Sequence, residues 1–353
     1  MTAETYSTIA VSFIIPVHNS EGTLLRALDS VFAQTVKEIE VIAVNDASED
    51  SSKKILAEYA EKEARLRIID FAENKGTMTA RRRGIEAAAG KYLLFLDPDD
   101  EFLPDGVEKL LKTAEKYQAD MVHFDLQEFR DGKRVWNWCP AKPGWIAGEL
   151  AVVRDLLKDH GHYWNLCLKM IRRDLFLPAL TDVEDFHCIM CEDLYMDLAV
   201  ELRAGNIFKT SFAPYIYHTG CGVTADRKRS LDSFRKLFSS LRALALSKAM
   251  LPEEFHAAMD EITLKQCRIL LTRCHHDLTA EDRENALAEL RQDPWCPEAM
   301  TLAETLPLLA GANTEDFLNG HPVLRKLLDF ILPPGTRRRL YFKTKIKRLL
   351  KKG

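Results

Sequence analysis

Long apolar runs are missing from the sequence. Nowhere in its 353 residues does an uninterrupted apolar stretch approach the length of about 18–20 residues that a membrane-spanning helix needs. The segment Met1 to Ala10 has no basic stretch followed by a long apolar run, so we expect no secretory signal. No Gly-x-Gly-x-x-Gly pattern follows the first predicted strand, which disfavours a nicotinamide-dependent dehydrogenase. The sequence therefore predicts a cytoplasmic protein without a membrane-spanning helix.

Cysteines at the spacing of a metal or disulfide framework are also scarce. Eight cysteines are scattered through the last two-thirds of the chain, and without a secretory signal we expect free thiols in a reducing compartment. Cys188 and Cys191 have zinc-like spacing, but no second pair lies at the usual interval. Cys274-His275-His276 is interpreted as a thiol and two imidazoles on a helix. We therefore expect no structural zinc.

The charge of the chain is unevenly distributed. The net charge is −4, yet residues 336–353 hold nine Lys or Arg and no acid, which leaves 40 basic and 53 acidic residues in the remainder. Within this tail Phe342, Ile346, Leu349 and Leu350 share one helical face with cations around it. This pattern predicts docking on an anionic membrane surface, at the inner face, with packing on the acidic body as the alternative. Nothing else in the chain supports binding to nucleic acid, and none is expected.

The first third of the sequence alternates strand-like and helix-like segments. Short apolar runs predict strands at residues 11–16, 40–45, 66–69, 92–96 and 120–124. Apolar residues at helical spacing between these runs predict helices at residues 24–32, 55–59, 79–89 and 104–117. This alternation predicts an α/β fold, with a mainly parallel Rossmann-like sheet and helices on both of its faces.

The same patterns predict how the whole chain is organised. The predicted parts are a catalytic domain at residues 1–225, an α-helical C-terminal region at 226–335 and the basic amphipathic tail at 336–353. The catalytic domain is expected to have a nucleotide-binding half at 9–125 and an acceptor half at 126–225. Within the helical region, Thr279 to Asp282 has the pattern of a capping box.

Polar residues follow three of the predicted strands directly. They are His18-Asn19, Asn45-Asp46 and Asp97-Pro-Asp-Asp100. In sheets of this kind ligands bind beyond the carboxyl ends of the strands, so the three groups are expected to converge on one edge. An Asp-x-Asp turn there supplies the carboxylate oxygens that Mg²⁺ and Mn²⁺ prefer, and these cations neutralise a nucleoside diphosphate. The alternative is ordinary turn chemistry, since Asn, Asp and Pro also form turns.

The order of four motifs resembles one known family. The motifs are Val11-Ser-Phe-Ile-Ile-Pro-Val-His-Asn19, Glu40-Val-Ile-Ala-Val-Asn-Asp-Ala-Ser48, Asn74-Lys-Gly76 with Ala80-Arg-Arg-Arg-Gly-Ile85, and Gly90-Lys-Tyr-Leu-Leu-Phe-Leu-Asp-Pro-Asp-Asp100. Together they resemble the family-2 inverting glycosyltransferases, whose A-type fold is Rossmann-like and binds nucleotide sugars. The resemblance covers residues 9–118 closely and 164–224 more loosely. Arg82 departs from it, because the family usually has Asn at that position.

The resemblance implies roles for the matching positions. Those expected to border the nucleotide donor are Pro16, His18, Asn19, Asp46, Gly76, Arg81 and Asp97. Asp46 matches the acid that contacts the base of the donor, which is typically uracil. Asp97 and Asp99 match the acids that face the metal, the ribose and the pyrophosphate. The alternatives without a ligand are a strand-end turn at Asn45-Asp46 and a solvated helix face at Arg81 to Arg83.

Two further positions complete the candidate site. Glu192 and Asp193 begin a predicted helix at 192–204, and the resemblance implies a Glu-Asp pair there that contains the general base. We assign the base to Asp193, with Glu192 as the second choice. An inverting reaction is one displacement in which a carboxylate takes the proton of the acceptor hydroxyl; the alternative is that these acids only stabilise the helix dipole. His218 follows a predicted strand at 214–218, and the resemblance implies metal ligation by it.

The sequence therefore predicts an inverting glycosyltransferase. It is expected to move a hexosyl or N-acetylhexosaminyl group from a nucleotide diphosphate donor, most simply a UDP-sugar, to a hydroxyl of a glycan or lipid-linked acceptor. Mn²⁺ or Mg²⁺ is the expected cofactor. Two alternatives stay open: a nucleotidyltransferase of similar fold, although Pro16 to Gly22 lacks its Gly-rich basic signature, and an inactive module that binds nucleotide sugars.

Overall fold

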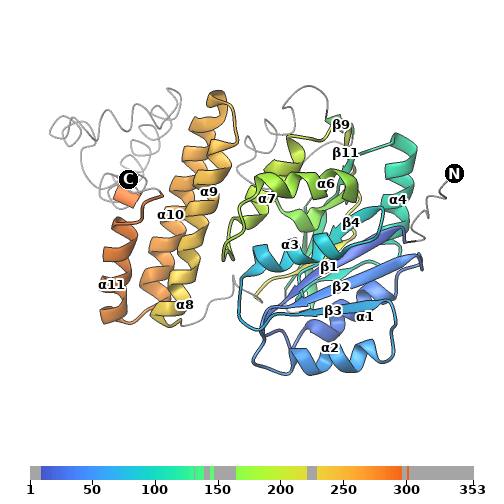
Figure 1. The fold of residues 1–353 in the computed structure, drawn as a ribbon, viewed down its shortest axis with the longest axis horizontal. Coiled ribbons are helices and arrows are strands. Elements are labelled where there is room, and N and C mark those ends of the chain that lie inside the picture. The colour runs from blue at the N-terminus through green and yellow to red at the C-terminus, as the bar shows by residue number, and fades with distance from the viewer. Residues whose placement is uncertain are drawn as a thin grey trace, which may run out of the picture. The chain divides into compact units, whose positions relative to one another are not determined.

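The computed structural model describes residues 9–130, 132–138, 144–146, 164–220, 229–295 and 300–301. The chain divides into two units, residues 1–226 and residues 227–353 (Figure 1). The predicted basic tail lies outside the described residues.

A large sheet forms the centre of the first unit. Among the described residues it has eight strands, in the order β3-β2-β1-β4-β10-β6-β11-β9. β1 is parallel to β2 and β4, β2 is parallel to β3, and β6 is parallel to β11, whereas β10 and β9 run antiparallel to their neighbours. The strands are β1 (Val11–Val17), β2 (Ile39–Asn45), β3 (Leu66–Asp70), β4 (Tyr92–Phe95), β6 (Met121–His123), β9 (Gly144–Ile146), β10 (Lys169–Arg172) and β11 (Ile207–Lys209). This confirms the predicted α/β class with a mainly parallel sheet.

A second, smaller sheet in the same unit was not predicted as a sheet. Its described strands run in the order β5-β12-β7-β8. They are β5 (Glu101–Phe102), β7 (Leu126–Arg130), β8 (Lys133–Trp138) and β12 (Tyr215–His218). Phe102 joins the two sheets, because its ring packs edge-on against Phe13 of β1 at 5.5 Å and against Tyr215 of β12 at 6.3 Å between centroids. The small sheet thus extends the core beyond the carboxyl edge of the large one.

Helices cover both faces of the large sheet. α1 and α2 lie on one face, and α3, α6 and α7 lie on the other (Figure 1). The helices of the first unit are α1 (Leu24–Phe32), α2 (Ser52–Ala60), α3 (Thr77–Ala87), α4 (Gly106–Tyr117), α6 (Arg173–Ala179) and α7 (Glu192–Glu201). α1 buries Leu24, Leu28 and Val31, which recur at the helical spacing that predicted it. α3 ends at Ala87, two residues before the predicted end at Ala89. Gly90 follows, and a Cβ at this position would lie 2.6 Å from the Ser12 nitrogen.

The described part of the second unit is helical, as predicted. It contains α8 (Leu231–Arg235), α9 (Ser239–Ala249), α10 (His256–Asp277) and α11 (Ala280–Arg291). Thr279 caps α11 by accepting a hydrogen bond of 3.2 Å from the Asp282 nitrogen, which confirms that half of the capping box. The helices α9 and α11 both pack against α10.

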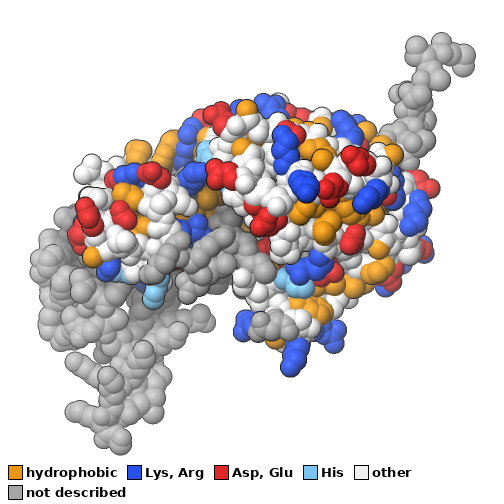
Figure 2. All heavy atoms as spheres, turned by 90° about the horizontal axis from the view of Figure 1, so that it is seen from below, with side chains coloured by type: hydrophobic (Ala, Val, Ile, Leu, Met, Phe, Trp, Pro, Cys, Tyr) orange, Lys and Arg blue, Asp and Glu red, His pale blue; other side chains and the backbone are white. Residues whose placement is uncertain are grey.

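The surface of the described chain is charged in both signs. Figure 2 shows acidic and basic side chains interspersed over the visible face of the first unit, so their fields oppose one another there. Across the ranges that the structure describes, no helix combines the length and the apolarity that crossing a membrane requires.

Candidate active site

The loops that follow β1 and β2 are tied together at the carboxyl edge of the large sheet. His18 Nδ1 lies 2.7 Å from the Asp46 carbonyl oxygen. The Asn19 nitrogen donates to Ser48 Oγ at 3.1 Å, and the Glu49 nitrogen donates to Asn19 Oδ1 at 2.8 Å. Asn19 adopts a left-handed backbone with φ of 50°, which asparagine tolerates better than most residues. His18 and Asn19 are exposed at this edge, so the structure brings two of the predicted donor contacts together.

Asp46 holds a third loop against this edge. Its carboxylate accepts hydrogen bonds from the Lys75 nitrogen at 2.6 Å, the Gly76 nitrogen at 2.8 Å and Asn74 Nδ2 at 2.9 Å. The side chain is buried, with 3% of the residue exposed. In the structure Asp46 therefore holds residues 74–76 in place. Its contact with the base of the donor stays a prediction.

Gly76 permits a close approach between two distant segments. It has a φ of +85°, and a Cβ at this position would lie 2.9 Å from both the nitrogen and the oxygen of Cys188. The Met78 nitrogen donates to the same Cys188 oxygen at 3.1 Å, and His187 Nε2 lies 2.9 Å from Asn74 Oδ1. Only glycine fits both the backbone angle and the space. The loop before α3 is thereby locked to the segment that leads into α7.

Arg81 of α3 is the centre of a buried carboxylate cluster. Its Nη2 donates to Asp97 Oδ1 at 2.9 Å and its Nη1 donates to Glu192 Oε1 at 2.9 Å. Nη1 also donates to the Asp193 carboxylate. Because only 2% of Arg81 is exposed, the alternative of a solvated helix face is wrong for this residue. The predicted metal turn and the predicted base thus meet at one guanidinium.

A single buried cation therefore faces three acids, of which Glu192 is the most buried and Asp97 the most exposed. Burial raises the pKa of Asp193, while Arg81 acts in the opposite direction. Burial and the neighbouring Asp193 charge raise the pKa of Glu192. If all three acids were ionised, the cluster would carry an uncompensated negative charge, which a buried site disfavours. Of the two acids on α7, Glu192 is the one more favoured in the protonated form, because its side chain is 7% exposed and that of Asp193 is 20% exposed.

The Asp97 to Asp100 turn is braced from the second sheet. Tyr215 donates its hydroxyl to Asp100 Oδ2 at 2.7 Å, and the His218 nitrogen donates to Asp100 Oδ1 at 2.8 Å. Asp100 is buried, with 1% exposed, whereas the Asp97 side chain is 34% exposed. Asp100 is therefore a structural acid, and Asp97 is the one that reaches the open edge.

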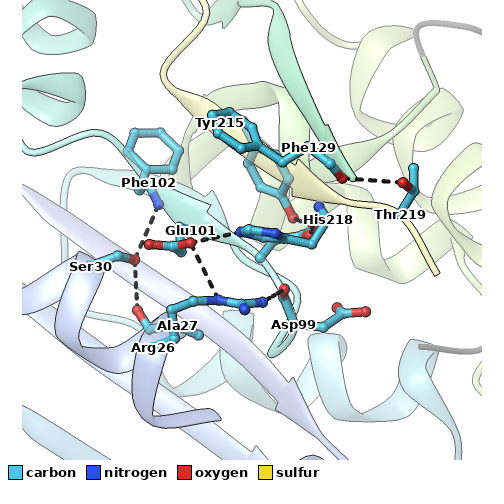
Figure 3. A network of polar contacts seen from close by, with 11 residues as sticks. Arg26, Ala27, Ser30, Asp99, Glu101, Phe102, Phe129, Tyr215, His218 and Thr219 are labelled. Atoms are coloured by element: carbon cyan, nitrogen blue, oxygen red, sulfur yellow. Dashed lines mark hydrogen bonds and ion pairs between the residues drawn. The ribbon is translucent and has the colours of Figure 1, made fainter. Parts of the chain in front are cut away.

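A network from α1 holds the other side of this turn (Figure 3). Arg26 Nη2 donates to the Asp99 carbonyl oxygen at 2.5 Å, and Arg26 Nε lies 3.3 Å from Glu101 Oε1. The same Glu101 oxygen lies 2.7 Å from His218 Nε2. The Asp99 carboxylate points away from this network in Figure 3, so the backbone is held while the side chain is directed elsewhere.

Sequence reasoning missed the residues that brace the turn. Tyr215 and Arg26 contact it from a strand and a helix that are remote in sequence, so no local pattern shows them. Asp100 stood inside the motif, but only its burial distinguishes it from Asp97 and Asp99. The sequence-predicted Pro16 is buried within β1, where it lies at the base of the edge.

Comparison with known families identifies a match over half of the chain. Residues 12–190 match the family described as Glycosyl transferase family 2. That range contains the loops of the edge, the Asp97 to Asp100 turn and the segment that leads into α7.

Several named relatives are similar in sequence. EpsH of Bacillus subtilis, which is named as a glycosyltransferase, is 43% identical over 264 residues, covering 72% of this chain and 74% of EpsH. EpsJ of the same organism is 31% identical over 214 residues, covering 59% of this chain and 60% of EpsJ. The glycosyltransferase GlyA of Streptococcus pneumoniae is 38% identical over 126 residues, covering 36% of this chain and 18% of GlyA. The chain thus spans less than two-thirds of EpsJ and GlyA.

A solved structure shares the fold. The crystal structure of S. aureus TarS 1–349 in complex with UDP-GlcNAc aligns with a TM-score of 0.57 over 83% of this chain and 84% of that chain. The sequence identity is 19%, so this likeness concerns the fold.

Proposed function

Because this chain belongs to glycosyl transferase family 2 and is a glycosyltransferase, we propose that it transfers a sugar from a UDP-sugar to a hydroxyl of a glycan or lipid-linked acceptor, with inversion. The observation that carries the proposal is the cluster of Asp97, Glu192 and Asp193 on Arg81 at the carboxyl edge of the sheet. It places a candidate metal carboxylate and a candidate base on the same guanidinium. In a single displacement a base activates the attacking hydroxyl while a metal can stabilise the leaving diphosphate, so these are the two groups that the reaction uses.

In the proposed mechanism Asp193 is the general base. The acceptor oxygen attacks the anomeric carbon, its proton passes to the Asp193 carboxylate, and the bond from that carbon to the diphosphate oxygen breaks to release UDP. Asp193 suits this role better than Glu192 because its side chain is more exposed and reaches the edge. A pKa raised by burial also makes the carboxylate a stronger base than an exposed aspartate.

The donor would lie along the edge formed by the three loops. His18, Asn19 and the backbone near Asp46 border it, and Arg81 stays behind the reacting groups as their counter-ion. The choice of uridine is supported by the fold shared with TarS, whose crystal structure holds UDP-GlcNAc.

Asp97 and Asp99 are the residues that fit a divalent cation. Mg²⁺ and Mn²⁺ accept carboxylate oxygens, often only one or two from the protein, with phosphate and water completing the shell. This suits the described residues, which contain no group of three His, Cys, Asp or Glu side chains arranged to hold a metal by themselves. His218, which the family resemblance implies as a further ligand, has its Nε2 at 2.7 Å from Glu101 Oε1, so Asp97 and Asp99 are the ligands that we propose. When bound, the cation would stabilise negative charge on the leaving diphosphate.

The test is release of UDP from a panel of donors. UDP-glucose, UDP-galactose, UDP-GlcNAc and UDP-GalNAc are each incubated with octyl glycosides or with water, with Mn²⁺, with Mg²⁺ or with EDTA. We expect one donor to turn over in a metal-dependent way. Asp193→Asn should bind UDP normally and lose about 10²–10⁴-fold in rate, while Glu192→Gln loses less. Normal transfer by Asp193→Asn with an inactive Glu192→Gln would move the base one residue earlier.

We also propose that the basic tail docks the enzyme on an anionic membrane surface. Residues 336–353 carry nine cations and no acid, and each cation near such a surface contributes about 1 kcal/mol. The test is co-sedimentation with anionic and neutral vesicles, comparing the full chain with a version truncated after Leu332. We expect only the full chain to bind, and only to the anionic vesicles; equal binding by both versions would reject the tail as the anchor.

A further inference from the structure

A row of acids runs along α7 from the candidate base into the core. Asp193, Asp197 and Glu201 are spaced at i, i+4 and i+8, so they lie on one side of the helix. The side chains of Asp197 and Glu201 are fully buried. Ionised acids are rarely buried without partners, so this row needs a cation from elsewhere in the fold.

Lys169, the first residue of β10, supplies that cation. Its Nζ bonds the Asp197 carboxylate and lies 3.5 Å from Glu201 Oε1. Its side chain is 1% exposed. His123 of β6 lies 3.5 Å from the same Glu201 oxygen, so the inner end of the row is enclosed by the two neighbouring strands.

The segment that precedes Lys169 reaches the outer end of the same row. The Leu166 backbone amide donates a hydrogen bond to the Asp193 carboxylate. Leu166 begins one turn of 3₁₀ helix, η1 (Leu166–Leu168), and Lys169 follows this turn directly. One short stretch of chain therefore contacts all three acids of the row.

From this arrangement we infer that Lys169 is a positioning residue for the general base, an inference that rests on the proposed function. A helix can rotate about its axis or slide along it, and either motion would displace Asp193. Lys169 opposes both motions, because from β10 it contacts Asp197 and Glu201. The Leu166 amide contacts the first acid of the row. Asp193 is then held against Arg81 in one orientation.

The energetics favour this role over a purely stabilising one. Taking a lysine and two acids out of water costs free energy that their mutual attraction recovers only in part, and apolar side chains of similar volume often stabilise a core equally well. A buried ionic cluster is better explained by the single geometry that it imposes. Here the geometry that the cluster imposes includes the position of the Asp193 carboxylate, which must accept a proton in the proposed reaction.

The experiment compares two variants with a matched control. Lys169→Met removes the cation and keeps a similar length. The triple variant Lys169→Met, Asp197→Asn, Glu201→Gln removes the whole charge cluster and avoids uncompensated buried acids, so it serves if the single variant does not fold. Arg229→Met is the control, because it breaks a similarly buried ion pair, Arg229 with Asp277 at 3.3 Å, in the second unit.

Three readouts separate positioning from stability. They are the folded fraction by circular dichroism, UDP affinity by calorimetry, and kcat per folded molecule with the donor and acceptor that are active in the panel. We expect the Lys169 variants to bind UDP as the wild type does and to lose about 10²-fold in kcat, the loss that a displacement of about 1 Å produces. Arg229→Met should keep its kcat even where it lowers the melting temperature.

The outcomes are distinguishable. Wild-type kcat in a folded Lys169 variant, with Asp193→Asn inactive in the same assay, would overturn the inference and leave the proposed function intact. An equal loss of kcat in Arg229→Met would also overturn it, because the effect would then follow from stability alone. Wild-type transfer by Asp193→Asn would remove the base assignment and this inference with it.

Discussion

Replacing Arg81 with methionine should destabilise the first unit in a manner that depends on pH. The change removes the guanidinium that bonds Asp97, Glu192 and Asp193 and leaves these acids facing one another. Removing one partner of a buried ion pair costs about 3–5 kcal/mol. For a unit of about 226 residues, each kcal/mol lowers the melting temperature by about 2–4 °C, so the expected decrease is roughly 6–20 °C near neutral pH.

The pH dependence follows from the direction of the pKa shifts. In the unfolded chain the acids titrate at their ordinary pKa values, near about 4. In the folded chain burial raises the pKa of Asp193 and of Glu192, and loss of Arg81 would raise both further, since Arg81 is the largest of the causes that lower them. At pH values between the unfolded and the folded pKa values of these acids, the folded state then binds more protons than the unfolded state. The free energy of unfolding therefore falls as the pH rises through this range. The deficit of Arg81→Met should be small at about pH 5 and large at about pH 8.

The assay is thermal unfolding of wild type and variant at both pH values, with Arg83→Met as the control. Arg83 lies two residues further along the same helix and carries the same charge, but its side chain is 51% exposed and it pairs with Glu86 at 2.6 Å. An exposed pair of this kind contributes about 0–1 kcal/mol, so the control should change little at either pH. Equal losses in the two variants, or a deficit that does not grow with pH, would refute the reasoning.

Two further predictions concern the edge of the sheet. Asp99→Ala should reduce metal-dependent UDP release by orders of magnitude and leave the circular dichroism spectrum unchanged, because the backbone of the turn is held by Arg26 and Asp100; near-normal release by this variant in EDTA would argue against a metal site. Gly76→Ala should lower stability by about 1–3 kcal/mol, since its Cβ would meet the Cys188 backbone at 2.9 Å. Gly132→Ala is the matched control, because Gly132 has a similar φ of +71° with no described atom within 4 Å of the added Cβ, and a smaller loss in Gly76→Ala than in the control would contradict the packing argument.

Five strands of the large sheet, β1 to β4 and β6, could be predicted because they are mainly apolar runs between helices, whereas β9, β10 and β11 were not predicted. β1 and β2 are buried at every position, so the sequence shows them as mainly apolar segments, with Ser12 in β1 and Glu40 and Asn45 in β2 as the polar exceptions. The small sheet lacks that signal. β7 is half-exposed over most of its length and β5 has two residues. β12 pairs with β7 across nearly ninety residues of chain, so no local pattern could reveal the partnership.

The candidate site was predictable only in part, for a similar reason. Acids that lie directly after a strand, such as Asp97, could be predicted as site residues from the predicted strands and from the family resemblance. Arg81 was predicted near the donor, but its contacts with acids more than a hundred residues away could not be read from its own helix. Its neighbours Arg82 and Arg83 both pair with Glu86, but Arg82 also donates to the Val183 carbonyl oxygen and Arg83 is largely exposed, so the three adjacent arginines have different environments.

The acid row of α7 shows why a helical pattern alone misleads. Leu194, Leu198 and Leu202 predict one buried face, and Asp197 lies at the flank of that face, where the helical pattern alone does not predict burial of an acid. In the structure α7 is buried on almost every side, and Asp197 is enclosed with the lysine of a neighbouring strand. The signal that was present is Lys169 itself, a cation at the start of β10 between the apolar residues Leu168 and Met170. A lysine among apolar residues and a row of acids spaced four residues apart are each ambiguous when considered alone. Because a buried charge needs a partner of opposite sign, the two patterns together predict that the lysine contacts the acids.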